Sequence, residues 1–190
     1  MKWKIGAVLM ALVFCLAIVP PLVSGAGAWD GIGGLFRGSG HELVVQAGNE
    51  KAVADGEAAS FGSDASAAVY RSENDDLMVP ASGFAKAMEL EFKEAADALT
   101  FVSGKTEVTV PVGGSEITGG KETVAVSSPA TNTDGTLFVP AEAVAQAFGW
   151  GYAEDGEYAV VTTKKEIKDK TVKKLAEKAE ELLGVPRAEL

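Results

Sequence analysis

Residues 135–150 of the chain read GTLFVPAEAVAQAFGW, and residues 75–90 read DDLMVPASGFAKAMEL. Each stretch holds a Val-Pro dipeptide followed by an alanine-rich segment, and Pro80 and Pro140 stand 60 positions apart. The residue before a proline is pushed toward extended geometry, and proline is well placed at the first position of a helix. Both stretches therefore predict a strand that passes directly into a short helix.

The two stretches stay in register beyond the dipeptide. Identical or similar apolar residues recur at the interval of 60, in the pairs Leu77/Leu137, Val79/Val139, Ala81/Ala141, Phe84/Val144, Ala85/Ala145, Met88/Phe148, Leu90/Trp150 and Phe92/Tyr152. We interpret this register as an internal duplication. It predicts two repeated strand–helix–strand units, at about residues 41–104 and 105–163.

The segments LMVPASGFAKA and LFVPAEAVAQA, each followed by an aromatic strand and a turn, resemble the copper amine oxidase N-terminal-like domain. This module, also called a stalk domain, is common on secreted proteins of Gram-positive bacteria. The resemblance covers about residues 41–163 and implies an α+β fold, in which an antiparallel sheet packs on short helices. It implies no catalytic apparatus, because the copper and quinone chemistry of amine oxidases belongs to a different domain.

This chain departs from the family pattern around both Val-Pro dipeptides. Arginines that the family usually carries there are absent, and the nearby positions hold Asp76, Ser82, Thr136 and Glu142. A recognition role that depends on those arginines is therefore not carried over to this chain.

The first 28 residues have the features of a secretory signal peptide. Lys2 and Lys4 precede a charge-free apolar run at 5–19, and small residues lead up to Ala28. We expect cleavage there, with a retained N-terminal anchor as the alternative, and no stable membrane span after cleavage. The glycine-rich segment 29–40 then forms a flexible N-terminus. The expected location is extracellular, in or near the cell wall.

The charge and the cysteine content exclude several classes of protein. Cys15 is the only cysteine, so a mature chain has no thiol for a disulfide framework or a thiolate metal site. Residues 29–163 contain seven basic and 21 acidic residues, and this field repels phosphate backbones, which excludes nucleic acid as a partner. We interpret the acidity as a means of solubility outside the cell.

No group of residues points to catalysis, to a metal or to a cofactor. His41 is the only histidine, which is too few for a typical copper or zinc site, and we expect it at the surface of a strand edge. The stretch from Asn132 to Gly135 lacks the ligand spacing of a calcium loop and is typical of a turn. The neighbouring carboxylates Glu154 and Asp155 are expected in a solvated hairpin turn rather than in a glycosidase site.

Trp150 and Tyr152 are the candidate ligand-binding residues. They stand two positions apart, so a strand would place them on one face, where exposed rings could stack on sugars. Their counterparts Leu90 and Phe92 favour the alternative, in which both rings are part of the core.

Residues 164–190 predict a C-terminal amphipathic helix. Apolar residues recur at spacings of three and four along it, at Val172, Leu175, Ala179 and Leu182. An isolated helix is marginal, so this helix either docks on its own domain or pairs with a partner, and we expect the former. We also expect residues 41–163 to fold without it.

Together these features predict a non-enzymatic binding or spacer module of the cell envelope. Cell-wall polysaccharide and another envelope protein are the expected partners. Two alternatives remain open at this point, namely a carboxylate-based hydrolase of wall sugars and a structural protein that oligomerises through its C-terminal helix.

Overall fold

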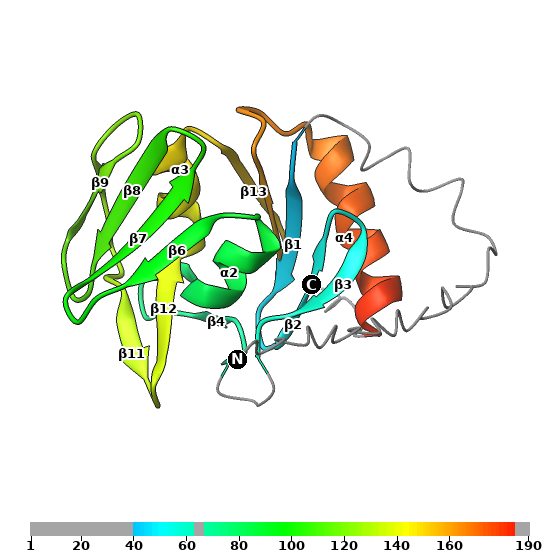
Figure 1. The fold of residues 1–190 in the computed structure, drawn as a ribbon. Helices are drawn as coiled ribbons and strands as arrows, with labels where there is room; N and C mark the ends of the chain where they lie inside the picture. The colour runs from blue at the N-terminus through cyan, green and yellow to red at the C-terminus, as the bar shows by residue number, and fades with distance from the viewer. Residues whose placement is uncertain (1–39, 63–66, 185–190) are drawn as a thin grey trace, which may run out of the picture.

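The computed structural model describes residues 40–62 and 67–184, which form an α+β fold of antiparallel sheets and three helices (Figure 1). The fold class predicted from the sequence is thus confirmed. The predicted signal peptide and all but the last residue of the glycine-rich segment lie outside the described residues. No helix within 40–62 and 67–184 is long and apolar enough to cross a membrane.

The two Val-Pro dipeptides meet at the centre of a four-stranded sheet, which we call the Val-Pro sheet. Val79 lies opposite Val139, and the strand order is β11-β12-β5-β4. The strands are β4 (Tyr70–Arg71), β5 (Leu77–Pro80), β11 (Thr131–Thr133) and β12 (Thr136–Pro140). Strands β5 and β12 are buried through both dipeptides, so the stretches that resemble each other in sequence pack against each other in space.

Each of these strands passes without a break into a helix, as predicted. Helix α2 spans Ala81–Ala87 and helix α3 spans Ala141–Phe148. The prolines take the N-cap position rather than the first helical position that we expected, because Pro80 and Pro140 keep extended ψ angles of 120° and 113°. Gly149 ends α3 in the left-handed conformation, with φ of 71°.

A second sheet, the middle sheet, is built from consecutive strands of the middle of the chain. Its order is β10-β9-β8-β7-β6, and every pairing is antiparallel. The strands are β6 (Glu91–Glu94), β7 (Ala98–Ser103), β8 (Thr106–Pro111), β9 (Glu116–Gly119) and β10 (Val124–Ala125).

The third sheet, the N/C sheet, joins strands from the two ends of the described chain. Its order is β13-β14-β1-β2-β3, and Glu42 at the start of β1 lies opposite Thr162 at the end of β14. The strands are β1 (Glu42–Gln46), β2 (Lys51–Ala54), β3 (Glu57–Ser60), β13 (Gly151–Asp155) and β14 (Tyr158–Thr162).

The two halves of the chain present the same order of elements. Five strands, a helix and two strands occur once from β1 to β7 and again from β8 to β14. The last strand of each half pairs with the first strand of the other, since β7 pairs with β8 and β14 pairs with β1. The expected strand–helix–strand units are therefore only part of each half. The strands after each helix join a sheet that also contains the first strands of the other half. Duplication as the origin of this order stays an interpretation.

The main core lies between the two five-stranded sheets, which enclose α2 and α3 (Figure 1). Apolar residues of the sheets alternate toward the helices, as in Leu43 and Val45 of β1 and Leu99 and Phe101 of β7. Phe84 of α2 meets Phe101 edge-on, with ring centroids 6.1 Å apart.

The C-terminal helix α4 (Asp169–Leu183) covers the outer face of the N/C sheet (Figure 1). Its buried side chains pack on a second apolar cluster contributed by β1, β2 and β14. The helix contributes Val172, Leu175, Ala176 and Ala179, and the sheet contributes Val44, Val53, Tyr158 and Val160. The expectation that this helix docks on its own domain is confirmed, although it begins at Asp169 rather than directly after Thr163.

Candidate functional site

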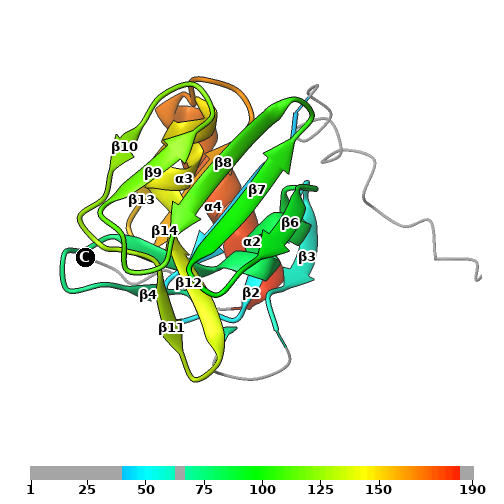
Figure 2. The same cartoon turned by 60° about the vertical axis from the view of Figure 1, so that its left-hand side comes forward.

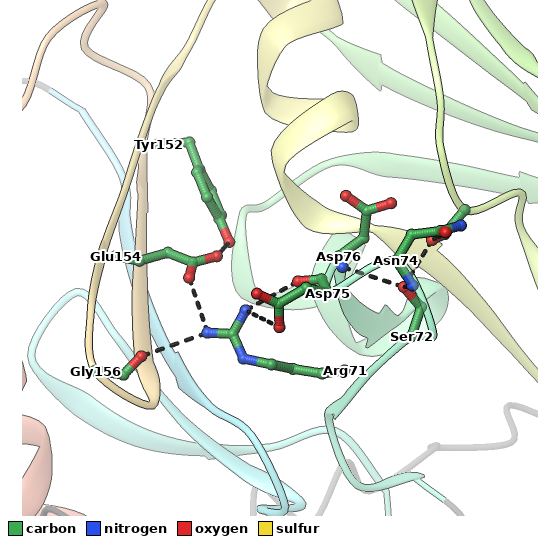
Figure 3. A network of polar contacts seen from close by, with 9 residues as sticks. Arg71, Ser72, Asn74, Asp75, Asp76, Tyr152, Glu154 and Gly156 are labelled. Atoms are coloured by element: carbon green, nitrogen blue, oxygen red, sulfur yellow. Dashed lines mark hydrogen bonds and ion pairs between the residues drawn. The ribbon is translucent and has the colours of Figure 1, made fainter. Parts of the chain in front are cut away.

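Trp150 and Tyr152 both lie against the main core and are partly buried. Trp150 stands between α3 and β13, where its ring stacks on Phe148 with centroids 4.4 Å apart. Tyr152 belongs to β13 and points toward β4 (Figure 3). Ligand binding by either residue stays a prediction.

The hydroxyl of Tyr152 leads into a charged cluster formed with Arg71 and Glu154, which we call the Arg71 cluster (Figure 3). Tyr152 donates a hydrogen bond to Oε1 of Glu154. Arg71, at the end of β4, donates from Nη2 to Oε2 of Glu154 at 2.8 Å and to the carbonyl of Gly156 at 3.4 Å. Each oxygen of the Glu154 carboxylate thus has a donor.

The sequence-based placement of Glu154 in a solvated hairpin turn was wrong. Glu154 and Asp155 belong to β13, and the turn to β14 is formed by Gly156 and Glu157. The shift matters because strand geometry turns the Glu154 side chain toward the Val-Pro sheet, where Arg71 binds it. The pairing joins residues 83 positions apart in the sequence.

Arg71 also holds the loop that follows β4. Its Nη1 donates to the carbonyl of Asp75 at 3.0 Å and lies 3.5 Å from the Asp75 carboxylate. Inside the loop, Oγ of Ser72 accepts hydrogen bonds from the backbone N–H groups of Asn74 and Asp76. Asn74 donates to the carbonyl of Ser127 at 2.7 Å, which ties the loop to the segment before β11. These contacts fix the position of the loop.

Three pKa values in and beside the cluster are raised. Burial, followed by the hydrogen bond to Glu154, raises the pKa of Tyr152 and keeps its hydroxyl a protonated donor. The hydrogen bond with Glu154 is the main cause that raises the pKa of Arg71. Burial, together with repulsion from Glu154 and Asp76, raises the pKa of Glu142 in the first turn of α3, against a hydrogen bond from Gln146 at 2.9 Å.

These contacts decide what the cluster can do chemically. The cation and the carboxylate neutralise each other, and the phenol is kept neutral. An external anion would have to displace Glu154 from Arg71 before it could bind. The arrangement favours a fixed, preorganised surface over one that gains or loses protons near neutral pH.

The remaining residues that the sequence singled out lie on turns and edges. His41 precedes β1 at the surface, with Nδ1 2.8 Å from Oδ2 of Asp55 and Nε2 3.6 Å from Oε2 of Glu89. The backbone N–H of Gly135 donates to Oδ1 of Asn132 at 3.0 Å. Asn132 lies in β11, and Asp134 and Gly135 form the expected turn to β12. Across 40–62 and 67–184, no group of three or more His, Cys, Asp or Glu residues could hold a metal ion.

Sequence reasoning missed Arg71 altogether. Its one visible signal is its scarcity, since it is among seven basic residues in the acidic stretch 29–163. Its partner could not be inferred from the sequence. The pairing depends on β13, which follows α3 in the second half of the chain but joins the N/C sheet together with β1, β2 and β3 of the first half.

Comparison with known proteins gives the chain a family. Residues 53–163 match the family model of the copper amine oxidase N-terminal domain. No curated protein and no solved structure matches the chain. The matched segment runs from within β2 to just beyond β14, so it holds both helices of the core and the whole Arg71 cluster. Because it spans more than half of the 190 residues, this chain belongs to the copper amine oxidase N-terminal domain family.

Proposed function

We propose that the protein is a secreted, non-enzymatic binding or spacer module of the cell envelope. The observation that carries the proposal is the mutual engagement of the charged groups in the Arg71 cluster. Glu154 accepts hydrogen bonds from both Tyr152 and Arg71, so the carboxylate best placed for acid–base chemistry is already occupied.

The extracellular location rests on the sequence of residues 1–28 and on the excess of acidic residues. Both are typical of an exported protein that stays soluble through its charge. Wall polysaccharide is the partner class that the exposed parts of Trp150 and Tyr152 favour, since partly exposed aromatic rings can stack on sugar rings.

One observation favours a second candidate, a hydrolase of wall sugars. The raised pKa of Glu142 is what a general acid of a glycosidase needs, and Glu154 is near enough to contribute to it. Against this candidate, Glu154 is paired with Arg71 at 2.8 Å, which leaves the site without a free second carboxylate from that residue.

The third alternative, assembly through the C-terminal helix, is less favoured. The apolar stripe of α4 is already buried on the N/C sheet, with Leu175 only 2% exposed. Self-association through this stripe would require the helix to leave its own domain.

Retention of the full chain on insoluble peptidoglycan and on purified wall polysaccharide tests the proposal. For a binder that uses Tyr152, we expect Tyr152→Ala to lose retention and Tyr152→Phe to keep it, because the phenylalanine ring still stacks. Thermal melting of both variants separates lost binding from lost folding. Release of soluble sugar by the wild type that Glu142→Gln abolishes would contradict a non-enzymatic role and establish the hydrolase.

A further inference from the structure

The C-terminal end of α3 is covered by the loop between β9 and β10. The backbone N–H of Lys121 donates to the carbonyl of Ala147 at 3.0 Å. A Cβ at Gly120 would lie 2.1 Å from that same carbonyl oxygen, so the loop touches the helix end directly. The side chain of Lys121 then passes over Gly149, where a Cβ would lie 2.7 Å from Cδ of the lysine.

The corresponding end of α2 is not covered in this way. The matching connection, between β2 and β3, is the two-residue turn of Asp55 and Gly56, which has no further residues to lay over the helix. Ala87 is consequently half-buried, whereas its counterpart Ala147 is fully buried. Within the described residues, no backbone N–H is bonded to the carbonyl of Ala87.

A groove with a volume of about 600 Å³ runs along this uncovered end, between β3 and α2. Figure 2 shows these two elements as neighbours. The walls of the groove are mostly small residues, which include Ala58 and Ala59 of β3 and Gly83 and Ala87 of α2. Strand β3 is the edge strand of the N/C sheet, so one side of its backbone has no neighbouring strand among the described residues. An exposed strand edge beside a groove is suited to pairing with an extended chain.

The rim of the groove is acidic. It presents Asp55, Glu57 and Glu89, with Lys86 as the basic residue of the lining. His41 lies beside this rim, 2.8 Å from Asp55 and 3.6 Å from Glu89. Glu89 is held in the left-handed region with φ of 52°, at the position where the second half has Gly149. A non-glycine residue in that region is strained, and here it places a carboxylate 3.6 Å from Nε2 of His41. The first half thus places a carboxylate where the second half accommodates a lysine.

We propose that this groove binds an extended, lysine- or arginine-bearing segment of a partner protein. The segment adds a strand to the edge of β3, donates a backbone N–H to the carbonyl of Ala87, and places its cation between Glu57 and Glu89. The contact that Gly120 and Lys121 make with the end of α3 is an example, within this protein, of the contact that we propose at the end of α2. The inference rests on the proposed binding function in that it names a partner class for the same module, at a site separate from Tyr152.

Charge decides between this occupant and a second copy of the chain. Pairing of two β3 edges would bring the acidic rims of both copies together, which is unfavourable. A basic segment instead meets the carboxylates of Glu57 and Glu89 with its own positive charge, and its binding should weaken as salt is added.

The test uses the full chain and a capped peptide that copies residues 117–124 with Glu122→Gln, so that Lys121 is its only charge. We expect the backbone NMR signals of Glu57–Ser60 and of Ala87 to shift on titration, with a Kd on the order of 1 mM, as suits one short added strand. The same peptide with Lys121→Glu should bind at least about tenfold more weakly, because it meets like charges.

Glu89→Gly is the deciding variant, because it copies the second half. We expect it to weaken binding of the lysine peptide about threefold, as for one exposed charge pair, without lowering the Tm. Glu91→Gln, at an exposed position on β6, is the matched control and should leave the Kd unchanged. A purely structural role for Glu89 would instead lower the Tm and leave the Kd as it was.

Three results would overturn the proposal. These are equal binding of the lysine and glutamate peptides, NMR shifts that fall away from β3 and α2, and a free protein that sediments as a dimer with the β3 amides already protected from exchange. Retention on wall polysaccharide is measured on the same samples. Peptide binding without retention on polysaccharide would count only against a polysaccharide partner. Retention on polysaccharide without peptide binding would count only against the groove.

Discussion

The N/C sheet and the middle sheet each contain five strands and each turn one face toward α2 and α3, but their other faces differ. The outer face of the N/C sheet is apolar and lies under α4. On the outer face of the middle sheet, four polar residues follow one another in register across four strands, in the order Lys93, Thr100, Thr109 and Thr118. No described helix covers that face.

The difference shows that the apolar pattern of a strand reflects how many of its two faces are covered. Strand β1 is apolar at the consecutive positions Leu43, Val44 and Val45, and all three are buried. In β7, buried Leu99 and Phe101 alternate with the partly exposed Thr100. A strand that is covered on both faces needs apolar residues at every position, whereas a strand covered on one face needs them at every second position.

The largest effect is expected from deleting residues 169–190, because the deletion removes α4 and leaves the outer face of the N/C sheet uncovered like that of the middle sheet. The deletion exposes Val44, Val53, Tyr158 and Val160 to water and removes the side chains that cover them. Burial of a single Val or Leu side chain is worth about 1.5–3 kcal/mol, so the loss approaches the whole stability of a typical domain. We therefore expect the truncated chain to lose its cooperative thermal transition, measured by circular dichroism.

This expectation revises the one drawn from the sequence, that residues 41–163 fold without the helix. Leu175→Ala gives a graded form of the experiment and should cost about 2–5 kcal/mol. Thr109→Ala on the uncovered sheet is the matched control and should stay within about 0.5 kcal/mol of the wild type. Cooperative melting of the truncated chain near the wild-type Tm would show that α4 is dispensable and restore the original boundary at Thr163.

A middle-sized effect is expected at Gly120, where the middle sheet touches α3. An alanine there must adopt φ of +67° and bring its Cβ within 2.1 Å of the Ala147 carbonyl. Strain and the forced shift of the backbone together should cost about 3 kcal/mol, measured by chemical denaturation. Gly104→Ala has a similar φ of +60° but open space around it, so it should cost only about 1 kcal/mol. Equal costs would mean that the close contact with the helix end contributes nothing.

The smallest effect is expected at Glu142, which has no acidic counterpart in the first half, where Ser82 stands. Its pKa is raised in the folded protein above the ordinary value of 4.5, so the folded state holds the proton more tightly than the unfolded state does. Stability is therefore lost as the pH rises above about 4.5. Glu142→Gln should remove this loss and stabilise the protein more at pH 7 than at pH 4. The gain should be no more than about 0.5 kcal/mol, because the carboxylate is only partly buried and solvent screens it. The measurement is the Tm of Glu142→Gln minus the Tm of the wild type, at each pH. If this difference were smaller at pH 7 than at pH 4, the pKa of Glu142 would not be raised in the folded protein.

The local part of the fold could be predicted from the sequence because it depends on neighbouring residues. Proline fixes its own φ and restricts the residue before it, so Val79 and Val139 had to be extended and the helices had to begin close by. The stripe of α4 was visible for the same reason, as spacing along one helix. The register of 60 positions also indicated which residues occupy equivalent places, as for Val79 and Val139, which lie opposite each other in the Val-Pro sheet.

The candidate site depends on long-range pairing, and this could not be predicted. Arg71 and Glu154 meet because β4 ends beside β13. The order of apolar and polar residues along the sequence does not show which strands become neighbours. The exchange of strands between the halves is equally invisible, since a chain of similar units could pair each strand within its own unit. Even the family match leaves part of this out, because it begins at Val53 and β1 lies before it.

The pairing of β1 with β14 has a consequence for the order in which the molecule can form. His41 and Thr163 are 122 positions apart and are joined by two hydrogen bonds at the open end of this pair. The backbone N–H of Thr163 donates to the carbonyl of His41 at 3.1 Å, and the backbone N–H of His41 donates to Oγ1 of Thr163 at 3.0 Å. The middle sheet uses consecutive strands and can assemble while the chain is still emerging. Strand β1 can pair early with β2, which follows it after a short turn, but its other edge must wait for β14 and so for almost all of the remaining residues. Loop closure over that length makes this last pairing slow. In a nascent chain, the edge of β1 that β14 later covers is therefore in need of protection from aggregation.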